Sequence, residues 1–267
     1  MPGISPHGFR GRLLLGTAGW SVPSSCRERV AGDGSHLARY GQALKAVEID
    51  TSFHRPHRRT TYERWAGVTP DDFCFAVKVP KAVTHAAAPQ PADIDRFLQE
   101  TAGLGGKLAV FLVQFPPGKV YDEETARQLF DALQASTSVQ LVCEPRHRSW
   151  FTDEVDQWLA GRRISRVAAD PARAEGADQP GGWRGLQYIR LHGSPRIYYS
   201  AYETSFLQRL NERLAVMSAT SDVWCIFDNT ALGAALENAL DLRDQLQLHS
   251  QPGHHGEAVE GICGERR

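Results

Sequence analysis

Eight short runs of apolar, β-branched or aromatic residues recur along the chain, and stretches with helical periodicity separate most of them. The runs cover residues 13–16, 46–49, 73–79, 108–114, 140–144, 166–169, 186–191 and 223–227. The helical stretches cover residues 35–44, 60–65, 91–104, 123–133, 152–159, 203–216 and 232–246. Most runs are continuously apolar, as is typical of parallel strands buried on both faces. This alternation predicts repeated βα units around a parallel sheet.

Eight such units in a chain of 267 residues match the number and size of a (β/α)8 barrel of the TIM type. The sequence predicts one α/β barrel domain over residues 10–248, and an open doubly wound sheet is the alternative fold. Residues 171–185 contain two prolines and several glycines, which predicts an irregular sixth crossover without a helix. Residues 249–267 are polar, glycine-rich and aperiodic, which predicts a disordered tail.

The composition argues against several classes of protein. With 30 Lys and Arg against 31 Asp and Glu residues, the net charge is −1, which is not the charge of a strongly basic nucleic-acid-binding chain. The five cysteines form no CxxC pair, and their odd number favours a reducing compartment. No apolar stretch is long enough for a signal peptide or a membrane span. We therefore expect a cytoplasmic protein with no membrane partner.

Polar and aromatic residues lie at or just beyond the ends of nearly all the runs. In a barrel of parallel strands these ends converge above a packed core, where side chains from several strands can build one site. Charged groups in a buried sheet are costly unless they are paired or used. The candidate site residues are Trp20, Glu48, His54, Lys78, His85, Gln114, Glu144, Arg146, His147, Asp170, Arg190, His192, Tyr198, Asp228 and Asn229.

Four of these candidates suit proton transfer. Glu144 and His147 lie at the end of the fifth run, and Asp170 and His192 are expected to approach from neighbouring strands. A mixed group of carboxylates and imidazoles can perform general acid–base catalysis. In this interpretation the protein is a hydrolase in which Glu144 or His192 is the general base.

The other candidates suit recognition of a small anionic, phosphate- or sugar-like substrate. Arg146 and Arg190 are expected to hold its oxygen atoms, and Lys78, Glu48 and Gln114 are expected to orient these groups. The remaining expected contributors to the binding surface are Trp20, His54, His85, Tyr198, Asp228 and Asn229.

Three alternatives stay open at this stage. Glu48, Lys78 and Arg190 suit a purely structural layer of ion pairs inside the sheet. His and carboxylate groups from different strands also suit a divalent metal that activates water, as in a metal-dependent phosphodiesterase, although no HExxH spacing is present. The same cluster can instead serve a binding module that grips a metabolite or a nucleic acid without turnover, and nucleic-acid binding would weaken steeply with salt.

Taken together, the segments at the run ends resemble the DUF72 family, also called YecE-like. The segments that carry the resemblance are GTAGW at 16–20, VEIDTSFHRP at 47–56, FAVK at 75–78, TH at 84–85, VQFPP at 113–117, EPRHRSW at 144–150, YIRLHG at 188–193 and FDNT at 227–230. The resemblance implies a TIM-type barrel, in agreement with the strand count. It implies no activity, because the family is named for having none assigned.

Overall fold

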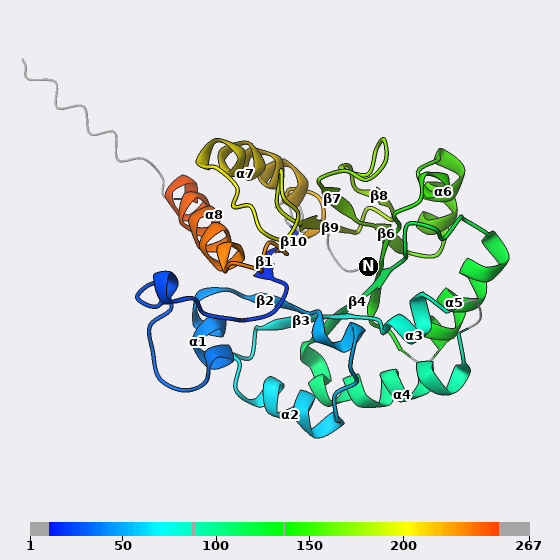
Figure 1. Ribbon diagram of the computed structural model, residues 1–267, viewed down its shortest axis with the longest axis horizontal. Coiled ribbons are helices and arrows are strands. Elements are labelled where there is room, and N and C mark those ends of the chain that lie inside the picture. The colour runs from blue at the N-terminus through cyan, green and yellow to red at the C-terminus, as the bar shows by residue number, and fades with distance from the viewer. Residues whose placement is uncertain (1–10, 87–88, 136, 251–267) are drawn as a thin grey trace, which may run out of the picture.

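The computed structural model of this chain describes residues 11–86, 89–135 and 137–250, in which strands and helices alternate in the predicted order (Figure 1). The strands are β1 (Leu13–Thr17), β2 (Ala46–Ile49), β3 (Cys74–Lys78), β4 (Leu108–Gln114), β5 (Gln140–Glu144), β6 (Ile164–Arg166), β7 (Ala168–Asp170), β8 (Gly181–Gly182), β9 (Leu186–Leu191) and β10 (Asp222–Phe227). The α-helices are α1 (His36–Ala43), α2 (Arg59–Gly67), α3 (Lys81–Thr84), α4 (Pro91–Thr101), α5 (Glu123–Ala135), α6 (Asp153–Gly161), α7 (Thr204–Ser218) and α8 (Ala234–Ser250). The short 3-10 helices are η1 (Ser24–Cys26), η2 (Thr51–Phe53), η3 (Ala102–Lys107) and η4 (Arg148–Trp150).

The strands pair in two sheets. The first has the order β1-β10-β9-β7, and all its pairs are parallel. The second has the order β2-β3-β4-β5-β6-β8, and its pairs are parallel except for β8 against β6. The predicted α/β class with parallel strands is therefore confirmed. One continuous sheet is not formed among the described residues; an isolated parallel bridge between Ala18 and Glu48 lies where β1 approaches β2.

The sixth run differs from the prediction of a single strand. It forms two short strands, β6 and β7, with Val167 between them. The backbone changes partners within this run, because Val167 donates to the carbonyl of Cys143 at 2.9 Å whereas Ala169 donates to the carbonyl of Ala177 at 2.7 Å. The crossover after it has no helix, as predicted, but it adds the two-residue strand β8.

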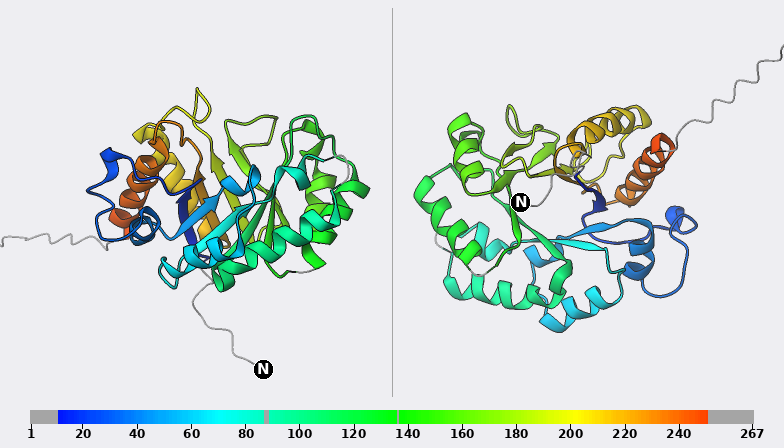
Figure 2. Two further views of the ribbon diagram at one scale, coloured as in Figure 1. Left: turned by 60° about the horizontal axis from the view of Figure 1, so that its bottom comes forward. Right: turned by 180° about the vertical axis from the view of Figure 1, so that it is seen from behind.

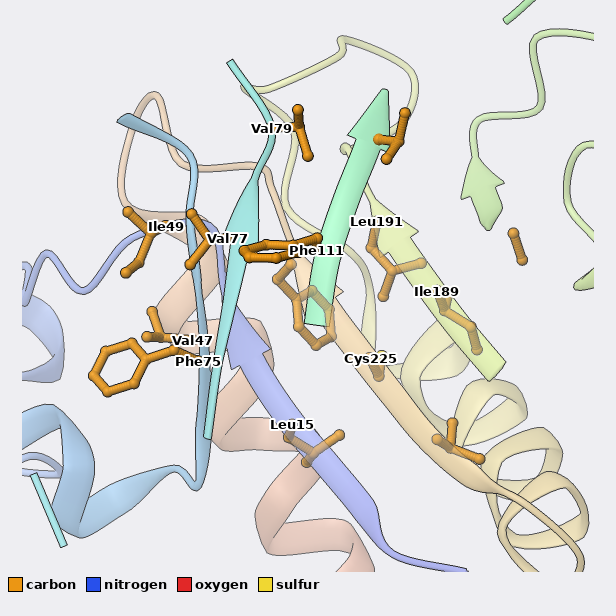
Figure 3. Packing of buried hydrophobic residues seen from close by; sticks show 14 of the residues in the cluster. Leu15, Val47, Ile49, Phe75, Val77, Val79, Phe111, Ile189, Leu191 and Cys225 are labelled. Atoms are coloured by element: carbon orange, nitrogen blue, oxygen red, sulfur yellow. The ribbon is translucent and has the colours of Figure 1, made fainter. Parts of the chain in front are cut away.

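Both faces of the strands are buried, which explains their continuous apolar sequences. One face packs in the large hydrophobic cluster that also contains side chains of the helices, and Figure 3 shows Leu15, Val47, Phe111, Ile189 and Cys225 among its members. The helices lie outside the strands in both views of Figure 2. The opposite face of the strands carries a second apolar cluster, which includes Leu14, Ala46, Ala76, Leu112, Val142, Tyr188, Trp224 and Ile226.

Local signals in the sequence position the helix starts. The Ser35 side chain accepts a hydrogen bond from the Ala38 N–H at 3.2 Å at the start of α1. Thr152 caps α6 in the same way, through the Val155 N–H at 3.3 Å. Pro91 begins α4, where its missing N–H leaves no hydrogen bond unmade.

The end of the chain differs from the prediction. Helix α8 continues to Ser250, so the first two residues of the predicted disordered tail, 249 and 250, belong to a helix. The rest of that prediction, residues 251–267, and the predicted domain start at residue 10 lie outside the described residues. Within the described part of the chain, no helix is both long and apolar enough to cross a membrane.

We predict that Gly16→Ala destabilises the fold. A Cβ at Gly16 would overlap the backbone carbonyl of Ala46, so β1 could not keep its place beside β2. Overpacking of this kind costs about 1–3 kcal/mol. Urea unfolding followed by circular dichroism measures the change in the free energy of unfolding.

Gly67→Ala is the matched control, because Gly67 ends α2 and no atom lies within 4 Å of a Cβ added there. Its free energy of unfolding should change by less than about 1 kcal/mol, in favour of folding. Equal stability of the two variants would contradict the close approach of β1 to β2.

Candidate functional site

The strand face that carries the second apolar cluster becomes polar at the carboxyl ends of the strands. Val142 is followed two residues later by Glu144, and Tyr188 by Arg190. Side chains two residues apart on a strand lie on the same face. The same spacing places further polar residues on this face, namely Glu48, Lys78, Gln114 and Asp228. We call these side chains, together with Glu144, Arg190 and His192, the Arg190 layer.

Arg190 occupies the centre of this polar layer and is completely buried. Its Nη1 donates to Glu144 Oε2 at 2.6 Å. Its Nη2 donates to Glu48 Oε1 at 2.6 Å and to Asp228 Oδ2 at 3.0 Å, and its Nε donates to Glu48 Oε2 at 3.1 Å. The guanidinium on β9 is therefore surrounded by carboxylates from β2, from β5 and from the residue that follows β10, and it is shielded from solvent.

His192 lies directly after β9 and is 5% exposed. Its Nδ1 lies 2.8 Å from Asp228 Oδ2, which as a carboxylate oxygen accepts the proton of that nitrogen. Its Nε2 lies 3.3 Å from Glu144 Oε1 but forms no hydrogen bond with the described protein groups. Burial lowers the pKa of His192, but the negative charge of Glu144 and the hydrogen bond to Asp228 outweigh burial, so the pKa is raised above 6.5.

Two further cations border the layer. Arg146 Nη2 lies 3.2 Å from Glu144 Oε1 and donates to Gln114 Oε1 at 3.3 Å. Lys78 Nζ lies 2.8 Å from Asp50 Oδ1. The side chains of Arg146 and Lys78 are 14% and 8% exposed, in contrast to the 0% of Arg190. Arg146 and Lys78 are therefore the cationic side chains of this layer nearest to solvent.

The two carboxyls that share Arg190 differ in acidity. Burial raises the pKa of Glu48, and the negative charges of Asp50 and Asp228 add to this, so the attraction of Arg190 does not bring it down. Burial also acts on Glu144, but the positive charges of Arg190, His192 and Arg146 outweigh it and hold the pKa of Glu144 well below 4.5. Glu144 is thus firmly ionised at neutral pH.

Three predicted site residues serve the loops instead. The Nδ1 of His147 accepts a hydrogen bond from the Ser149 N–H at 3.2 Å and so caps η4. The Asp170 side chain accepts a hydrogen bond from the Tyr202 hydroxyl at 2.7 Å. Asn229 is completely buried and donates to the carbonyl of Ser200 at 3.0 Å. Among the described residues, no side-chain hydrogen bond or ion pair joins these three side chains to the Arg190 layer.

The predicted aromatic and histidine residues surround the layer at different places. Trp20 packs edge-on against Trp65, with ring centroids 4.9 Å apart. His54 and His85 both contact the ring of Phe53, at 4.8 and 5.2 Å. Tyr198 is 38% exposed, and its ring stands perpendicular to that of His192 at 5.9 Å. Of these, Tyr198 is the one that contacts the Arg190 layer directly.

Two members of the layer are absent from the predicted site. Asp50 is the partner of Lys78, and it also lies 3.7 Å from Arg190 Nη2. The Tyr188 hydroxyl donates to Glu48 Oε2 at 2.8 Å. The period of two identifies both in retrospect, because Asp50 lies two residues after Glu48 and Tyr188 two residues before Arg190.

The acids of the layer face cations. The described residues include no group of three or more His, Cys, Asp or Glu side chains arranged to hold a metal ion. The carboxylate oxygens of Glu48, Glu144 and Asp228 are instead directed at Arg190. The arrangement favours proton transfer at His192 and electrostatic binding of an anion beside it.

We predict that Arg190→Met lowers the free energy of unfolding by about 3–5 kcal/mol at neutral pH, the cost of breaking a buried ion pair. Without the guanidinium, the folded-state pKa values of its carboxyl partners rise above their unfolded values. The loss of stability is greatest when these carboxyls are ionised, and it becomes smaller as the pH falls and they take up protons. Urea unfolding from neutral to mildly acidic pH should show that the difference in the free energy of unfolding between the variant and the unaltered protein becomes smaller.

Arg12→Met is the control for this experiment. Arg12 pairs with Asp222 at 2.7 Å, but its side chain is 65% exposed. An exposed pair contributes less than about 1 kcal/mol. Equal losses in the two variants would contradict the central place of Arg190.

The histidines should titrate in a fixed order. Burial and the positive charge of Arg55 lower the pKa of His57 below 6.5, and burial with the charge of Lys81 does the same for His85. His192, whose pKa is raised, should therefore hold its proton to higher pH than either. Imidazole resonances followed by NMR over a pH series measure this, and a His192 pKa below that of His85 would contradict the network.

The DUF72 family, described as a protein family of unknown function, matches residues 14–259. UPF0759 protein YunF of Bacillus subtilis is 24% identical over 269 aligned positions, which cover 88% of this chain and 95% of YunF. UPF0759 protein YecE of Escherichia coli K12 is 25% identical over 166 positions, 59% of each protein.

Crystal structures agree with these matches. A DUF72 family protein from Enterococcus faecalis V583 is similar with a TM-score of 0.74 at 24% identity, covering 90% of this chain and 99% of that one. A DUF72 family protein from Thermotoga maritima MSB8 gives a TM-score of 0.70 at 22% identity, covering 88% and 99%. The sequence match over most of the chain, together with the shared fold, shows that this chain belongs to the DUF72 family.

Proposed function

We propose that the layer around Arg190 is the active site of a hydrolase that acts on a small anionic substrate, with His192 as the general base. The observation that carries the proposal is the environment of His192. Its Nδ1 is held by Asp228 at 2.8 Å, while its Nε2 is buried without a hydrogen bond to a described protein group. A buried polar atom without a hydrogen bond costs about 1–3 kcal/mol. The charge of Glu144 at 3.3 Å offsets part of that cost, and a substrate or the water to be activated would supply the missing hydrogen bond.

The pairing of His192 with two acids suits proton transfer. Asp228 fixes the orientation of the ring, and the Glu144 carboxylate beside Nε2 stabilises the imidazolium that forms when the base takes a proton. The low pKa of Glu144 makes it a weak base. Of the two bases that the sequence predicts, His192 is therefore the stronger candidate, and Glu144 acts on it electrostatically.

Arg146 and Lys78 suit the anionic part of the substrate. Arg146 and the Nε2 of His192 both lie within 3.3 Å of Glu144 Oε1, so the guanidinium and the proposed base are close neighbours. The Arg146 side chain is 14% exposed and that of Lys78 is 8% exposed, whereas Arg190 is completely buried among its carboxylates. We assign Arg190 a structural role in place of the substrate contact expected from the sequence. A phosphate or carboxylate group is the chemistry that Arg146 and Lys78 would recognise.

Tyr198 is the side chain that would admit the substrate. Its ring stands against His192, and it is more than one-third exposed on the segment after β9. Its backbone has a φ of 69°, a conformation uncommon for a residue with a side chain. A rotation of this side chain would uncover the imidazole, and it would also release the Tyr198 hydroxyl from Arg146.

The geometry also supports the barrel expected from the sequence. Strands β6 and β7 follow each other across Val167, and they pair with β5 and β9 respectively. The bridge between Ala18 and Glu48 links the first strand to the second. We propose that the two sheets are two arcs of one (β/α)8 barrel and that the Arg190 layer closes the carboxyl end of its interior.

A non-catalytic binding module is the second candidate. The observation that favours it is that Glu48, Glu144 and Arg190 are already paired with one another, which leaves His192 as the group able to exchange a proton. A metabolite held beside these paired groups would stay bound without turnover. A nucleic-acid ligand would instead show an affinity that falls steeply with added salt.

We predict that His192→Gln abolishes hydrolysis. Phosphate monoesters, phosphate diesters and sugar phosphates are screened with the unaltered protein, and the variant is assayed on any substrate found. Loss of a general base should lower turnover by about 100-fold or more. Because His192 acts as a base, the rate should rise with pH through its raised pKa, with the midpoint above 6.5.

His147→Gln is the matched control, because this imidazole caps η4. It should keep turnover while losing about 0.5–2 kcal/mol of stability. Full activity in His192→Gln would overturn the assignment of the base. Binding of an anion by the unaltered protein, with no turnover of any ester in the panel, would favour the binding module.

A further inference from the structure

A cavity lies between the segment after β2 and the helices α3 and α4, and we call it the Phe53 cavity. Its volume is about 430 Å³, within the range of small-molecule sites. Ser52 to Pro56 form one wall, α3 and its flanking residues another, and one face of α4 the third. His54 and His85, which the sequence assigns to the binding surface, line this cavity.

The floor of the cavity is aromatic and the wall is cationic. Phe53 and Phe97 are buried and line it. Arg55 and Lys81 also line it, and no carboxylate of the described residues lies within ion-pair distance of either side chain. The positive charges of Lys81, Lys78 and Arg146 contribute, after burial, to the lowered pKa of His85. The wall therefore carries two positive charges, those of Arg55 and Lys81, that no described carboxylate neutralises.

The acids of the cavity are fewer and differently placed. Asp93 pairs with Arg96 at 3.3 Å across one turn of α4. Glu100 lies on the same helix, and burial raises its pKa. Apart from this pair, the lining carries the cations Arg55 and Lys81 and one carboxyl, that of Glu100, so its net charge is positive.

We propose that this cavity is a binding site for an anion that carries a flat apolar group, such as an aromatic phosphate or carboxylate. Arg55 and Lys81 bind the anionic group, and the rings of Phe53 and Phe97 contact the apolar part. Charged donors give the anion its affinity, and the aromatic floor distinguishes such a ligand from an inorganic anion. The site does not depend on chemistry at His192.

Phenyl phosphate is the probe, and isothermal titration calorimetry measures its affinity with inorganic phosphate as the comparison. Phenyl phosphate should bind more tightly than inorganic phosphate. The double variant Arg55→Met/Lys81→Met should weaken its binding by about tenfold or more. Glu100→Gln removes a like charge from the cavity and should strengthen binding, which a general loss of folding would not do.

Two controls separate this cavity from the Arg190 layer. Arg58→Met removes a cation of the same segment that is not part of the lining, and it should leave the affinity unchanged. Arg146→Met removes the proposed anion-binding group of the other site and should change the affinity much less than the double variant does. Phenyl phosphate that fails to bind, or that binds equally well to the double variant, overturns the proposal. Loss of binding in Arg146→Met alone would place the ligand in the Arg190 layer and overturn this inference while supporting the proposed function.

Discussion

The burial of one guanidinium among three carboxylates is the interaction on which the rest of the structure depends. Arg190 extends from β9, in the four-stranded sheet, to Glu48 and Glu144 in the six-stranded sheet. It therefore joins two sheets whose direct backbone contact between β1 and β2 is an isolated bridge. A charge at this depth is tolerated only because every nitrogen of the guanidinium has an anionic partner. The ion pairs and the arrangement of the strands thus require each other.

The same network gives its two glutamates different acidities. Glu144 lies beside three cations and stays ionised, whereas Glu48 lies near two other carboxylates and binds a proton more readily. Groups of one chemical type whose environments push their pKa values apart are typical of sites built for proton transfer. His192 lies between Asp228 and the ionised Glu144. Its acidity is consequently set by groups from two other strands.

The sequence allowed much of the fold and part of the site to be predicted. Strands β2, β4, β5 and β9 have the predicted bounds to the residue, because each is a short run rich in apolar residues that a polar residue ends or directly follows. The grouping of Glu144, Arg190, His192 and Asp228 was also expected, since all lie at strand ends. His147 and Asp170 have equally suitable positions in the sequence. They were diverted by local partners, Ser149 and Tyr202, whose geometry depends on the path of the loops.

The sequence by itself determined the alternation of strands and helices and the polar layer at the strand ends. Both follow from short-range rules, since the period of two places Tyr188, Arg190 and His192 on one face whatever the rest of the chain does. Tertiary structure alone decided the division into two sheets, the choice of Asp50 as the partner of Lys78 and the formation of the Phe53 cavity. These features join segments far apart in the chain, and their energies depend on distances and burial that exist only once the strands and loops have packed.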